Sequence, residues 1–554
     1  MKLVPPLLLL IPVLTALPLY LVHYYENVRQ SILGHPLSTT FWPISTGFLS
    51  TSKNLGFTDS VSLISEDEYQ HWIERETHVA FESIIRNIGG PYSGPDLADS
   101  AVTPGAVVAS PSKKAPDYFY QWVRDAGITI NTLVTAYADQ KAQNSTLRTV
   151  IRDYITAAHS LQRVSNPSGD FLSLTGLGEP KFHMDGRPFE DHWGRPQRDG
   201  PALRAIAIIN YLNTEVRHRI GSYRTRFVHD TFADVVRHDL NYVVRYWQHD
   251  GFDLWEEVKG YHFYTAMVHK RALELGAELA RNLGHFNLAQ RYRHEAQNAK
   301  FIIANKFYDE ERGHLIETID YSARSGLDSA LFLGTIHATN LLSDDWTVQE
   351  NSLYAPYSDE IVASLVKYLD DMRYRYPINH QRLQAFEQNG INSSLVGFGV
   401  GRYPEDVYNG IGMSDGNPWF LCTATVSHNL YLLADYLYTR PASFSLTVTE
   451  ATKPFYGLFL STLPTGFDWN QPGPFIYSRS DRYFTEFVHA IVAFADSFLD
   501  VIREHHDQSS NGAMSEQFSR HDGYMTGAEK LTWSYGAFWS AVRQRQLVYK
   551  KMKQ

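Results

Sequence analysis

The chain has 554 residues, of which 44% are hydrophobic and 20% are charged, and its formal net charge is −10. These values are typical of a globular protein with enough length to bury a large core. Its basic residues do not gather in a stripe with interleaved aromatic residues, so we expect no nucleic-acid partner.

Aromatic residues make up 14% of the chain and include 34 Tyr and 11 Trp. They indicate either a large core or a cleft lined with flat rings, which would suit the apolar faces of sugars. The single cysteine, Cys422, excludes an internal disulfide and any metal site built from several cysteines. Its context, LCTA, predicts a buried thiol. The histidines form no HExxH motif, and we expect neither a metal nor a cofactor.

Residues 1–22 are an apolar N-terminal segment, MKLVPPLLLLIPVLTALPLYLV. The segment is long enough to span a bilayer, although its prolines disfavour one straight helix. We predict a signal peptide or signal anchor, with membrane anchoring through residues 3–22 if it is retained. The protein would then be secreted, vacuolar or anchored on a lumenal membrane. The sequons that begin at Asn144 and Asn392 fit passage through a glycosylating compartment.

Residues 25–66 show no sustained period and are interpreted as an N-terminal extension. Ser65 and Glu68 then predict a capping box at the start of a helix. Asp199, with Pro201 after it, predicts another helix start. Strand-like alternation is scarce, and 445–462 is where we expect some. Apolar residues at helical spacing predict a mainly α chain with helices over 147–161, 199–211, 230–247, 262–284, 357–374, 420–438, 486–503 and 530–550.

Loops rich in Gly, Pro, Trp, Arg and acidic residues lie between the predicted helices. They recur at intervals of about one or two helical hairpins, so a closed ring of antiparallel helix pairs would bring them to one end. Such loops on a rigid scaffold commonly carry function. The five are YFYQWVRD (118–125), WGRPQRDGPALR (193–204), DLWEEVKG (253–260), GRYPEDVY (401–408) and SEQF (515–518).

Two adjacent glutamates, Glu256 and Glu257, follow Trp255 in one of these loops. A carboxyl group buried against an indole has a raised pKa and can donate a proton near neutrality. Glycoside hydrolysis needs such an acid and a second carboxylate across the sugar, for which Glu516 is available. Neighbouring side chains diverge, so at most one glutamate of the pair could serve the leaving oxygen. Alternatively, both are solvated charges.

Arg124 and Asp125 offer a donor fork beside an acceptor, which suits a pair of sugar hydroxyls. A structural salt bridge is the alternative interpretation of this pair. The GMSDG stretch at 412–416 lacks the strand and helix that a nucleophile elbow needs. His505 and His506 lie past a predicted helix end, in a stretch that we interpret as solvated.

Together these loops resemble the fungal glucoamylases of glycoside hydrolase family 15 over about residues 67–550. The resemblance covers SPSKKAPDYFYQWVRD, WGRPQRDGPALR, DLWEEVKG, GRYPEDVY with GNPWFL, SEQF and LTWSY. It implies that residues 67–554 form a catalytic domain with an all-α, (α/α)6 barrel fold. It also implies the release of β-D-glucose from the non-reducing ends of α-1,4-glucans, and more slowly from α-1,6 bonds, with inversion.

The resemblance also implies individual roles. Glu256 matches the general acid and Glu516 the general base, and in an inverting site they should stand roughly 6.5–9.5 Å apart. Glu257 matches a substrate-binding residue, and Gln517 is expected to help position groups in the site. The other residues expected to bind substrate are Tyr118, Trp122, Arg124, Asp125, Trp193, Leu254, Trp255, Arg402, Tyr408 and Trp419.

The chain departs from the family pattern in several places. Lys259 stands where Asn is common, which bears on the outer subsites. We expect no starch-binding module after LTWSY, and hence action on soluble starch, glycogen or maltooligosaccharides by a monomer. Two other functions stay open. One is a different (α/α)6 exo-hydrolase, directed at trehalose or dextran, and the other is a non-catalytic, membrane-tethered glucan-binding scaffold.

Overall fold

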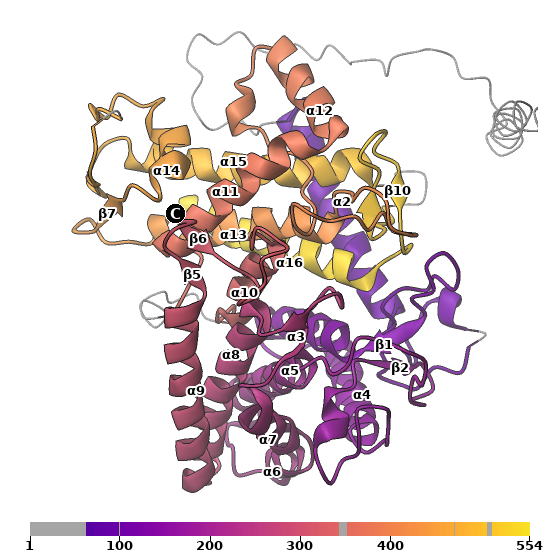
Figure 1. Cartoon of the computed structure of the whole chain (residues 1–554). Helices are drawn as coiled ribbons and strands as arrows, with labels where there is room; N and C mark the ends of the chain where they lie inside the picture. Colours follow the sequence, from indigo (N-terminus) through magenta and orange to yellow (C-terminus); the bar gives the residue numbers. More distant parts are fainter. Residues whose placement is uncertain (1–61, 99, 343–351, 470, 507–511, 554) are drawn as a thin grey trace, which may run out of the picture. The chain divides into compact units, whose positions relative to one another are not determined.

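The computed structural model describes residues 62–553, except for 99, 343–351, 470 and 507–511 (Figure 1). The predicted signal segment at 1–22 lies outside the described residues, as does nearly all of the predicted extension at 25–66. Within the part that is described, no helix has the length and apolar character needed to cross a membrane.

Within the described residues, six helices form an inner ring in which each contacts the next and the last contacts the first. Several of them, such as α5 and α13, are buried on almost every face, as expected for helices inside a barrel. The ring consists of α3 (Val123–Asp139), α5 (Asp199–Glu215), α8 (Phe263–Asn282), α10 (Ser329–Ala338), α13 (Phe420–Tyr438) and α16 (Thr532–Met552).

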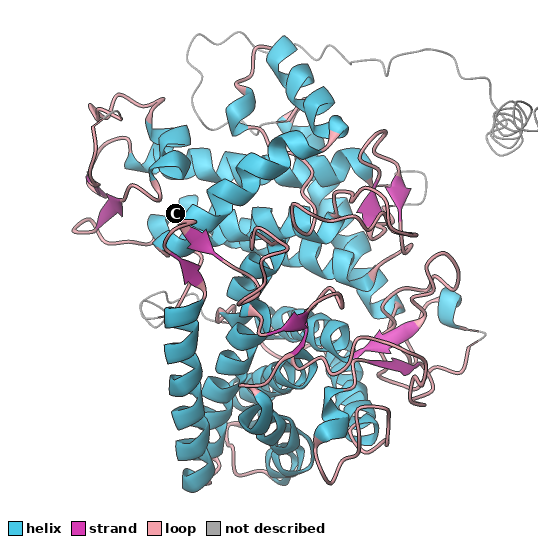
Figure 2. Cartoon of the chain, in the orientation of Figure 1, coloured by secondary structure: helices cyan, strands magenta, loops and turns pink. Residues whose placement is uncertain are grey.

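A second layer of helices packs outside this ring (Figure 2). Outer helices alternate with inner helices along the chain, which makes the architecture an all-α, (α/α)6 barrel as predicted. Each outer helix turns one apolar stripe inward, for example Leu147, Val150 and Tyr154 in α4. The outer layer consists of α2 (Glu66–Arg86), α4 (Ser145–Leu161), α7 (Arg237–Tyr246), α9 (Phe286–Lys306), α11 (Asp359–Arg375) and α15 (Phe484–His505).

The strands are short and form two-stranded antiparallel sheets in the connections. Three of these sheets contain residues of the loops named above. The pairs are β1 (Tyr120–Trp122) with β2 (Lys181–His183), β3 (Gly251–Phe252) with β4 (Lys259–Gly260), β5 (Tyr308–Asp309) with β6 (His314–Leu315), β7 (Ser445–Val448) with β8 (Phe475–Ser478), and β9 (Gln517–Phe518) with β10 (Met525–Thr526).

The smaller helices also lie in the connections between barrel helices. The region predicted as one helix over 230–247 is divided, because one π-helical turn, Phe232–Val236, interrupts the run between α6 and α7. The smaller α-helices are α6 (Arg226–Thr231), α12 (Pro377–Gln388) and α14 (Lys453–Leu460), and the 3-10 and π turns are η1 (Pro95–Leu97), η2 (Thr175–Gly178), η3 (Val216–Ile220), η4 (Phe232–Val236) and η6 (Ser393–Leu395).

Local signals in the sequence located several element ends. The capping box at Ser65 is present, since its hydroxyl accepts from the Glu68 amide and the Glu68 carboxylate accepts from the Ser65 amide. Asp199 is the first residue of α5 rather than its N-cap, which is Arg198. The strand expected within 445–462 is β7.

The interpretation of His505 and His506 as solvated was wrong. His505 is the last residue of α15, and its ring stacks on Phe518 at a centroid distance of 4.5 Å. His506 is buried and accepts a hydrogen bond from the Trp72 indole nitrogen. The polar residues around the pair gave no sign of these aromatic partners, which come from distant parts of the chain.

Arg204 of α5 and Asp239 of α7 join the two layers through a bidentate ion pair. Arg204 Nε lies 2.8 Å from Asp239 Oδ2, and Arg204 Nη2 lies 2.6 Å from Oδ1. Both side chains are buried. A buried pair of this kind adds little over an apolar substitute, but breaking it leaves an unpaired charge in the interior.

We predict that Arg204→Met lowers the free energy of unfolding by about 3–5 kcal/mol, because Asp239 would remain buried without its partner. Urea unfolding followed by circular dichroism would measure the loss. Arg226→Met is the matched control, since the Arg226–Asp230 pair is exposed and should contribute below about 1 kcal/mol. Equal losses in the two variants would contradict the prediction.

Candidate active site

The functional loops lie at the end of the barrel where the inner helices begin. The first residues of α3, α13 and α16 contribute to a cavity of about 380 Å³ at this end. Helix N-termini carry partial positive charge and favour carboxylates and other electron-rich oxygens nearby. The cavity is lined by Ala109, Pro116, Tyr118, Trp122, Arg124, Asp125, Trp193, Leu254, Trp255, Glu256, Glu257, Arg402, Tyr408, Ile411, Met413, Trp419, Leu421, Glu516, Leu531 and Trp533.

A tight turn between β3 and β4 separates the two adjacent glutamates. Asp253 Oδ1 accepts hydrogen bonds from the amides of Glu257, at 2.7 Å, and of Val258, at 2.8 Å. Glu256 has a φ of +68°, in the left-handed region that residues other than glycine seldom occupy. Such backbone strain persists only where surrounding contacts enforce it. The turn therefore aims the two neighbouring carboxylates at different partners.

Glu256 is held through one of its two carboxylate oxygens. Its Oε1 accepts from Trp122 Nε1 at 2.6 Å and from Gln197 Nε2 at 2.8 Å, and Arg124 Nη2 lies 3.5 Å away. Among the residues that the structure describes, no donor contacts Oε2. If the group is protonated, the three donors leave Oε2 as the oxygen that carries the proton toward the cavity.

Glu257 lies between two guanidinium groups. Its Oε1 is 2.8 Å from Arg402 Nη2, and its Oε2 is 2.6 Å from Arg324 Nη2 and accepts from the Tyr403 hydroxyl. Burial alone would raise the pKa of Glu257, but Arg402, Tyr403 and Arg324 outweigh it and hold this pKa below its ordinary value. Glu257 is thus a fixed carboxylate acceptor.

Glu516 enters the cavity from the loop before β9 and is fully buried. Burial raises the pKa of Glu516 to about 7, while the hydroxyls of Tyr118 and Tyr408 and the charge of Arg402 act in the opposite direction. Tyr408 donates to Oε2 at 3.3 Å, and the two tyrosine hydroxyls are 3.2 Å apart. The group can therefore exchange a proton near neutral pH.

Arg124 and Asp125 lie in the first turn of α3 and are both buried. Arg124 Nη1 donates to Gln197 Oε1 at 2.8 Å and to Asp199 Oδ2 at 3.2 Å. Burial, together with Glu256 and Asp199, raises the pKa of Asp125 to about 6 despite the neighbouring arginine. The pair belongs to a buried hydrogen-bonded network that also borders the cavity.

The structure brings all but one of the predicted site residues to this cavity. The exception is Gln517, which is fully buried and does not line the cavity. Its Oε1 accepts from Asn417 Nδ2 at 3.0 Å, and its backbone pairs with Trp419. Gln517 therefore lies behind the wall of the cavity and holds Asn417 and Trp419 there, so its contact with the site is indirect.

Sequence reasoning assigned no role to several residues that complete the site. Gln197 connects Glu256 to Arg124, and Arg324 and Tyr403 hold Glu257. Gln197 lies within a motif that was recognised, whereas Arg324 precedes α10 in a segment without a marked loop. Ile411 and Met413 are largely exposed and form an apolar rim at the cavity.

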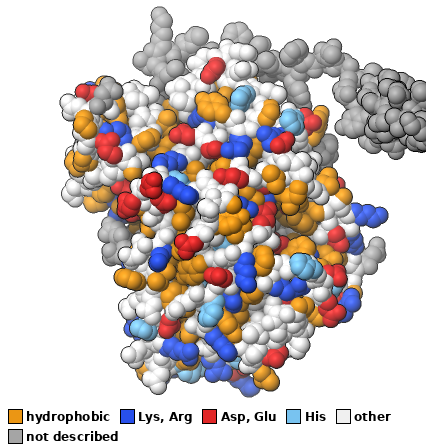
Figure 3. Space-filling view, viewed as in Figure 1, with side chains coloured by type: hydrophobic (Ala, Val, Ile, Leu, Met, Phe, Trp, Pro, Cys, Tyr) orange, Lys and Arg blue, Asp and Glu red, His pale blue; other side chains and the backbone are white. Residues whose placement is uncertain are grey.

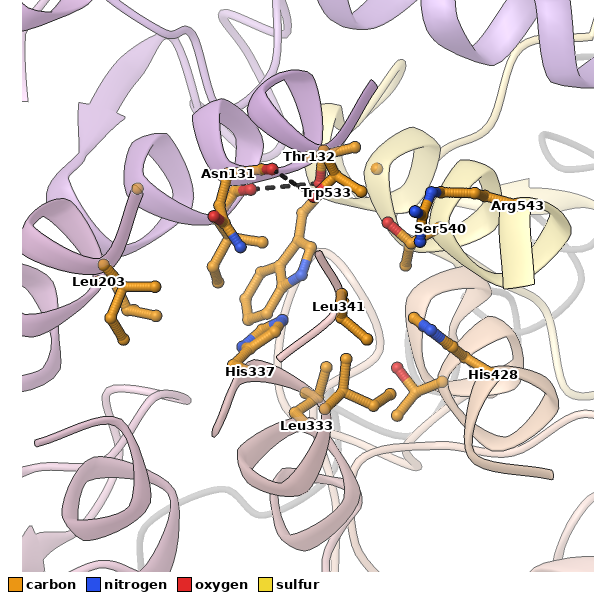
Figure 4. Close-up of a pocket in the computed structure, with 18 residues that line it drawn as sticks. Asn131, Thr132, Leu203, Leu333, His337, Leu341, His428, Trp533, Ser540 and Arg543 are labelled. Carbon is orange, nitrogen blue, oxygen red and sulfur yellow. Dashed lines mark hydrogen bonds between the residues drawn. The ribbon is translucent and has the colours of Figure 1, made fainter. Parts of the chain in front are cut away.

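A second, narrower cavity of about 50 Å³ lies between the inner helices, with Trp533 common to both cavities (Figure 4). His337 and His428 reach it from α10 and α13, and burial lowers the pKa of His337 to about 4 and of His428 to about 3. Its 18 described lining residues include no carboxylate. The acid–base groups thus belong to the larger cavity.

Charge is mixed over the surface, and the described residues hold no cluster suited to a metal ion. Acidic and basic side chains are interspersed on the face drawn in Figure 3. Among the described residues, no group of three or more His, Cys, Asp or Glu side chains is arranged to bind a metal. The larger cavity is lined by carboxylates, arginines and aromatic rings.

Comparison with known proteins places this architecture in a family. The model of Glycosyl hydrolases family 15 matches residues 94–543. A glucoamylase of Saccharomycopsis fibuligera is 34% identical over 504 residues, which cover 88% of this chain and 92% of that protein. An intracellular, sporulation-specific glucoamylase of Saccharomyces cerevisiae is 34% identical over 518 residues, which cover 89% and 87% of the two chains.

The likeness extends to three dimensions. A solved glucoamylase structure from Saccharomycopsis fibuligera superposes with a TM-score of 0.78 at 33% identity, and the match covers 87% of this chain and 96% of that one. A family 15 glucoamylase from Hypocrea jecorina gives 0.72, also at 33% identity, over 87% and 73% of the two chains. The chain therefore belongs to glycosyl hydrolase family 15.

Proposed function

We propose that the protein is an exo-acting, inverting glucoamylase that releases β-D-glucose from the non-reducing ends of α-1,4-glucans, and more slowly from α-1,6 branches. The observation that carries this proposal is the pair Glu256 and Glu516, which come from separate loops and line one cavity. The inner helices begin at this cavity, so it admits the end of a chain rather than its middle.

Glu256 acts as the general acid. In the protonated group, Oε1 accepts from Trp122 and Gln197, and Oε2 carries the proton toward the glycosidic oxygen. The proton passes to that oxygen as the bond to C1 breaks, and Glu256 becomes a carboxylate. The donors around Oε1 stabilise the carboxylate that forms, which lowers the barrier to the transfer.

Glu516 acts as the general base. A water molecule between Glu516 and C1 loses its proton to the carboxylate while its oxygen bonds to C1 from the face opposite the leaving group. One bond forms as one breaks, and the configuration at C1 inverts. Solvent then returns the proton to Glu256 and removes the one on Glu516. We expect the two carboxyl groups to stand roughly 6.5–9.5 Å apart in the substrate complex.

The remaining polar residues bind the terminal glucose. Glu257 offers carboxylate oxygens whose charge is fixed, and Asp125 offers a second acceptor. Arg402 uses Nε and Nη2 on Asp406 and Glu257. Nη1 has no acceptor in the described part of the chain, so it can donate to a sugar hydroxyl. The indoles of Trp122, Trp193 and Trp419 provide apolar surface for the ring faces.

We propose soluble glucans as substrates, namely soluble starch, glycogen and maltooligosaccharides. The apolar rim of Ile411 and Met413 borders the cavity, where the next sugar units would pass, and Lys259, two residues after Glu257, is exposed. A trehalose- or dextran-directed hydrolase of the same fold is the second candidate. A non-catalytic glucan-binding scaffold is less well supported, since a pure binder has no need of two carboxyl groups held in such different environments.

We also propose that the chain enters the secretory pathway as a monomeric glycoprotein. Residues 1–22 support this proposal through their composition, with 3–22 as a membrane anchor if the segment is kept. Asn144 and Asn392, the two sequon residues, lie at helix starts that solvent reaches. One chain supplies every lining residue of the cavity, so the site needs no second subunit.

Glu256→Gln and Glu516→Gln should each lower kcat by about 10²–10⁴-fold with little change in KM, because each group acts mainly in the transition state. Steady-state hydrolysis of maltoheptaose would measure both constants. Glu310→Gln serves as the control. Glu310 is exposed and does not line the cavity, so this variant should keep the wild-type kcat. Turnover near the wild-type rate in either site variant would show that the carboxyl group is not required.

Glu257→Gln should raise KM as well as lower kcat, because it weakens an acceptor whose charge is fixed by Arg402 and Arg324. The amide would also place its NH₂ against one of these guanidinium groups, so the loss should exceed that of one sugar hydrogen bond. Initial rates over a range of maltoheptaose concentrations would measure it. An unchanged KM would argue against a binding role for Glu257.

The anomer of the first product tests the mechanism directly. Proton NMR within minutes of adding the protein to maltoheptaose should show β-glucose before mutarotation produces the α anomer. Early α-glucose would mean retention through a covalent intermediate and would refute inversion. Trehalose and isomaltose assayed in parallel would separate the second candidate, and bound maltoheptaose without any product would favour the scaffold.

Tyr408→Phe should move the acid limb of kcat/KM to higher pH. The tyrosine hydroxyl stabilises the carboxylate form of Glu516, so removing it raises the pKa of this base, and activity is then lost sooner as pH falls. Tyr403→Phe is the matched control, because that hydroxyl bonds to Glu257 instead. A shift toward lower pH, or the same shift in both variants, would contradict the assignment.

A further inference from the structure

Lys181 is a buried cation enclosed by aromatic rings. Its side chain is 2% exposed. The Nζ atom lies 3.4 Å from the centre of the Trp193 ring, 3.9 Å from Phe189, 4.3 Å from Tyr120 and 4.8 Å from Trp122. An ammonium is attracted to the negative faces of such rings, and the attraction grows when water is excluded. These four rings and Lys181 are called the lysine cage below.

The cage is assembled by the antiparallel pair of β1 and β2 and by the loop that follows β2. Lys181 of β2 lies directly opposite Trp122 of β1. The Trp122 and Trp193 rings meet nearly edge-on at 6.2 Å, and Phe189 meets Trp193 edge-on at 5.7 Å. The rings thus contact one another as well as the ammonium, so loss of the cation would affect the orientation of all of them.

Two walls of the cage are also walls of the catalytic cavity. Trp122 and Trp193 both line that cavity, whereas Lys181 does not. Trp122 also donates its indole N–H to Glu256 Oε1 at 2.6 Å. The ammonium therefore lies behind the two indoles, one of which donates to Glu256, and it is buried from solvent. There its charge is weakly screened and acts on Glu256 over a longer distance than it would in water.

We propose that Lys181 is a positioning residue that orients Trp122 and Trp193 and whose positive charge acts on Glu256. The inference rests on the proposed function of Glu256. A nearby cation favours negative charge on a carboxyl group, so we expect loss of the Lys181 charge to extend activity toward higher pH. The Lys181 charge also helps to stabilise the carboxylate that proton transfer leaves behind.

The other charged groups around both residues are accounted for. Glu256, Asp117 and Asp191 act on Lys181 with opposite charge, and Arg195 acts with like charge. Glu256 also faces Arg124 and Asp125 from α3. Because these groups remain when Lys181 is replaced, the change in the pH profile isolates the contribution of its ammonium.

Lys181→Met keeps the length and apolar stem of the side chain and removes the charge, whereas Lys181→Arg keeps the charge. For Lys181→Met we expect the alkaline limb of kcat/KM to move up by about half a pH unit, with kcat lowered by about tenfold because the indoles lose their orientation. In Lys181→Arg the alkaline limb should stay near its wild-type position. If Lys181 had a solely structural role, Lys181→Met would lower activity without moving the alkaline limb of kcat/KM.

A tryptophan fluorescence titration of the wild-type protein tests the cage without any assay of hydrolysis. Burial lowers the pKa of Lys181 to about 8, so loss of the ammonium should change the emission of Trp122 and Trp193 with a midpoint near that pH. The transition should be absent in Lys181→Met. Absence of a midpoint near pH 8 in the wild type would overturn the proposal even if the variants do not fold.

The outcomes separate this inference from the proposed function. Wild-type protein that shows the fluorescence transition but releases no glucose would refute the function and leave the cage intact. Active wild-type protein whose alkaline limb is unmoved, or moved down, in Lys181→Met would refute the role of Lys181 alone. An alkaline limb that moves equally in Lys181→Met and Lys181→Arg would attribute the effect to packing and would also overturn the proposal.

Discussion

The shared direction of the six inner helices is the constraint on which the rest of this structure depends. The chain returns through an outer helix before each new inner helix, so the segments that precede the inner helices gather at one end. Motifs separated by long stretches of sequence therefore meet around one cavity. Helix N-termini gather there too, and their partial positive charge favours the carboxylates that the loops supply.

Three carboxyl groups in this cavity have different partners, and these partners give them different properties. Glu257 is neutralised by two guanidinium groups, so its charge is fixed. Glu516 is buried with the hydroxyls of Tyr118 and Tyr408 as side-chain partners, and burial raises its pKa to about 7. Glu256 is bound through a single oxygen, Oε1, by the Trp122 indole and the Gln197 amide. Separation of this kind is how one fold keeps an acid and a base side by side.

The structure also connects the strain at Glu256 to the chemistry. Its left-handed backbone is held by Asp253, a buried residue that does not line the cavity. Without that turn, the neighbouring glutamates would not be aimed at separate sets of partners. The lysine cage works in the same indirect way, because it acts on the indoles that contact the acid.

Local sequence patterns predicted many of the helices but not all of them. The capping box and the stripe of α4 were readable because large apolar residues recur on one face. Helix α9 was missed, since its buried face consists mainly of alanines and tyrosine, while Phe286 and Phe301 are exposed. Its periodicity is correspondingly weak. The inner helices α3 and α10 were missed for the opposite reason, because they are buried on nearly all faces and show no single apolar stripe.

By itself the sequence determined the helical class, the loops that carry the site and the presence of two separable glutamates, because these depend on residue types and short-range spacing. Only the tertiary structure decided that Glu256 and Glu516 line one cavity, that Gln517 lies behind its wall and that Lys181 is enclosed by four rings. Each of these facts depends on contacts between segments that are far apart in the chain, and closure of the ring alone brings such segments together.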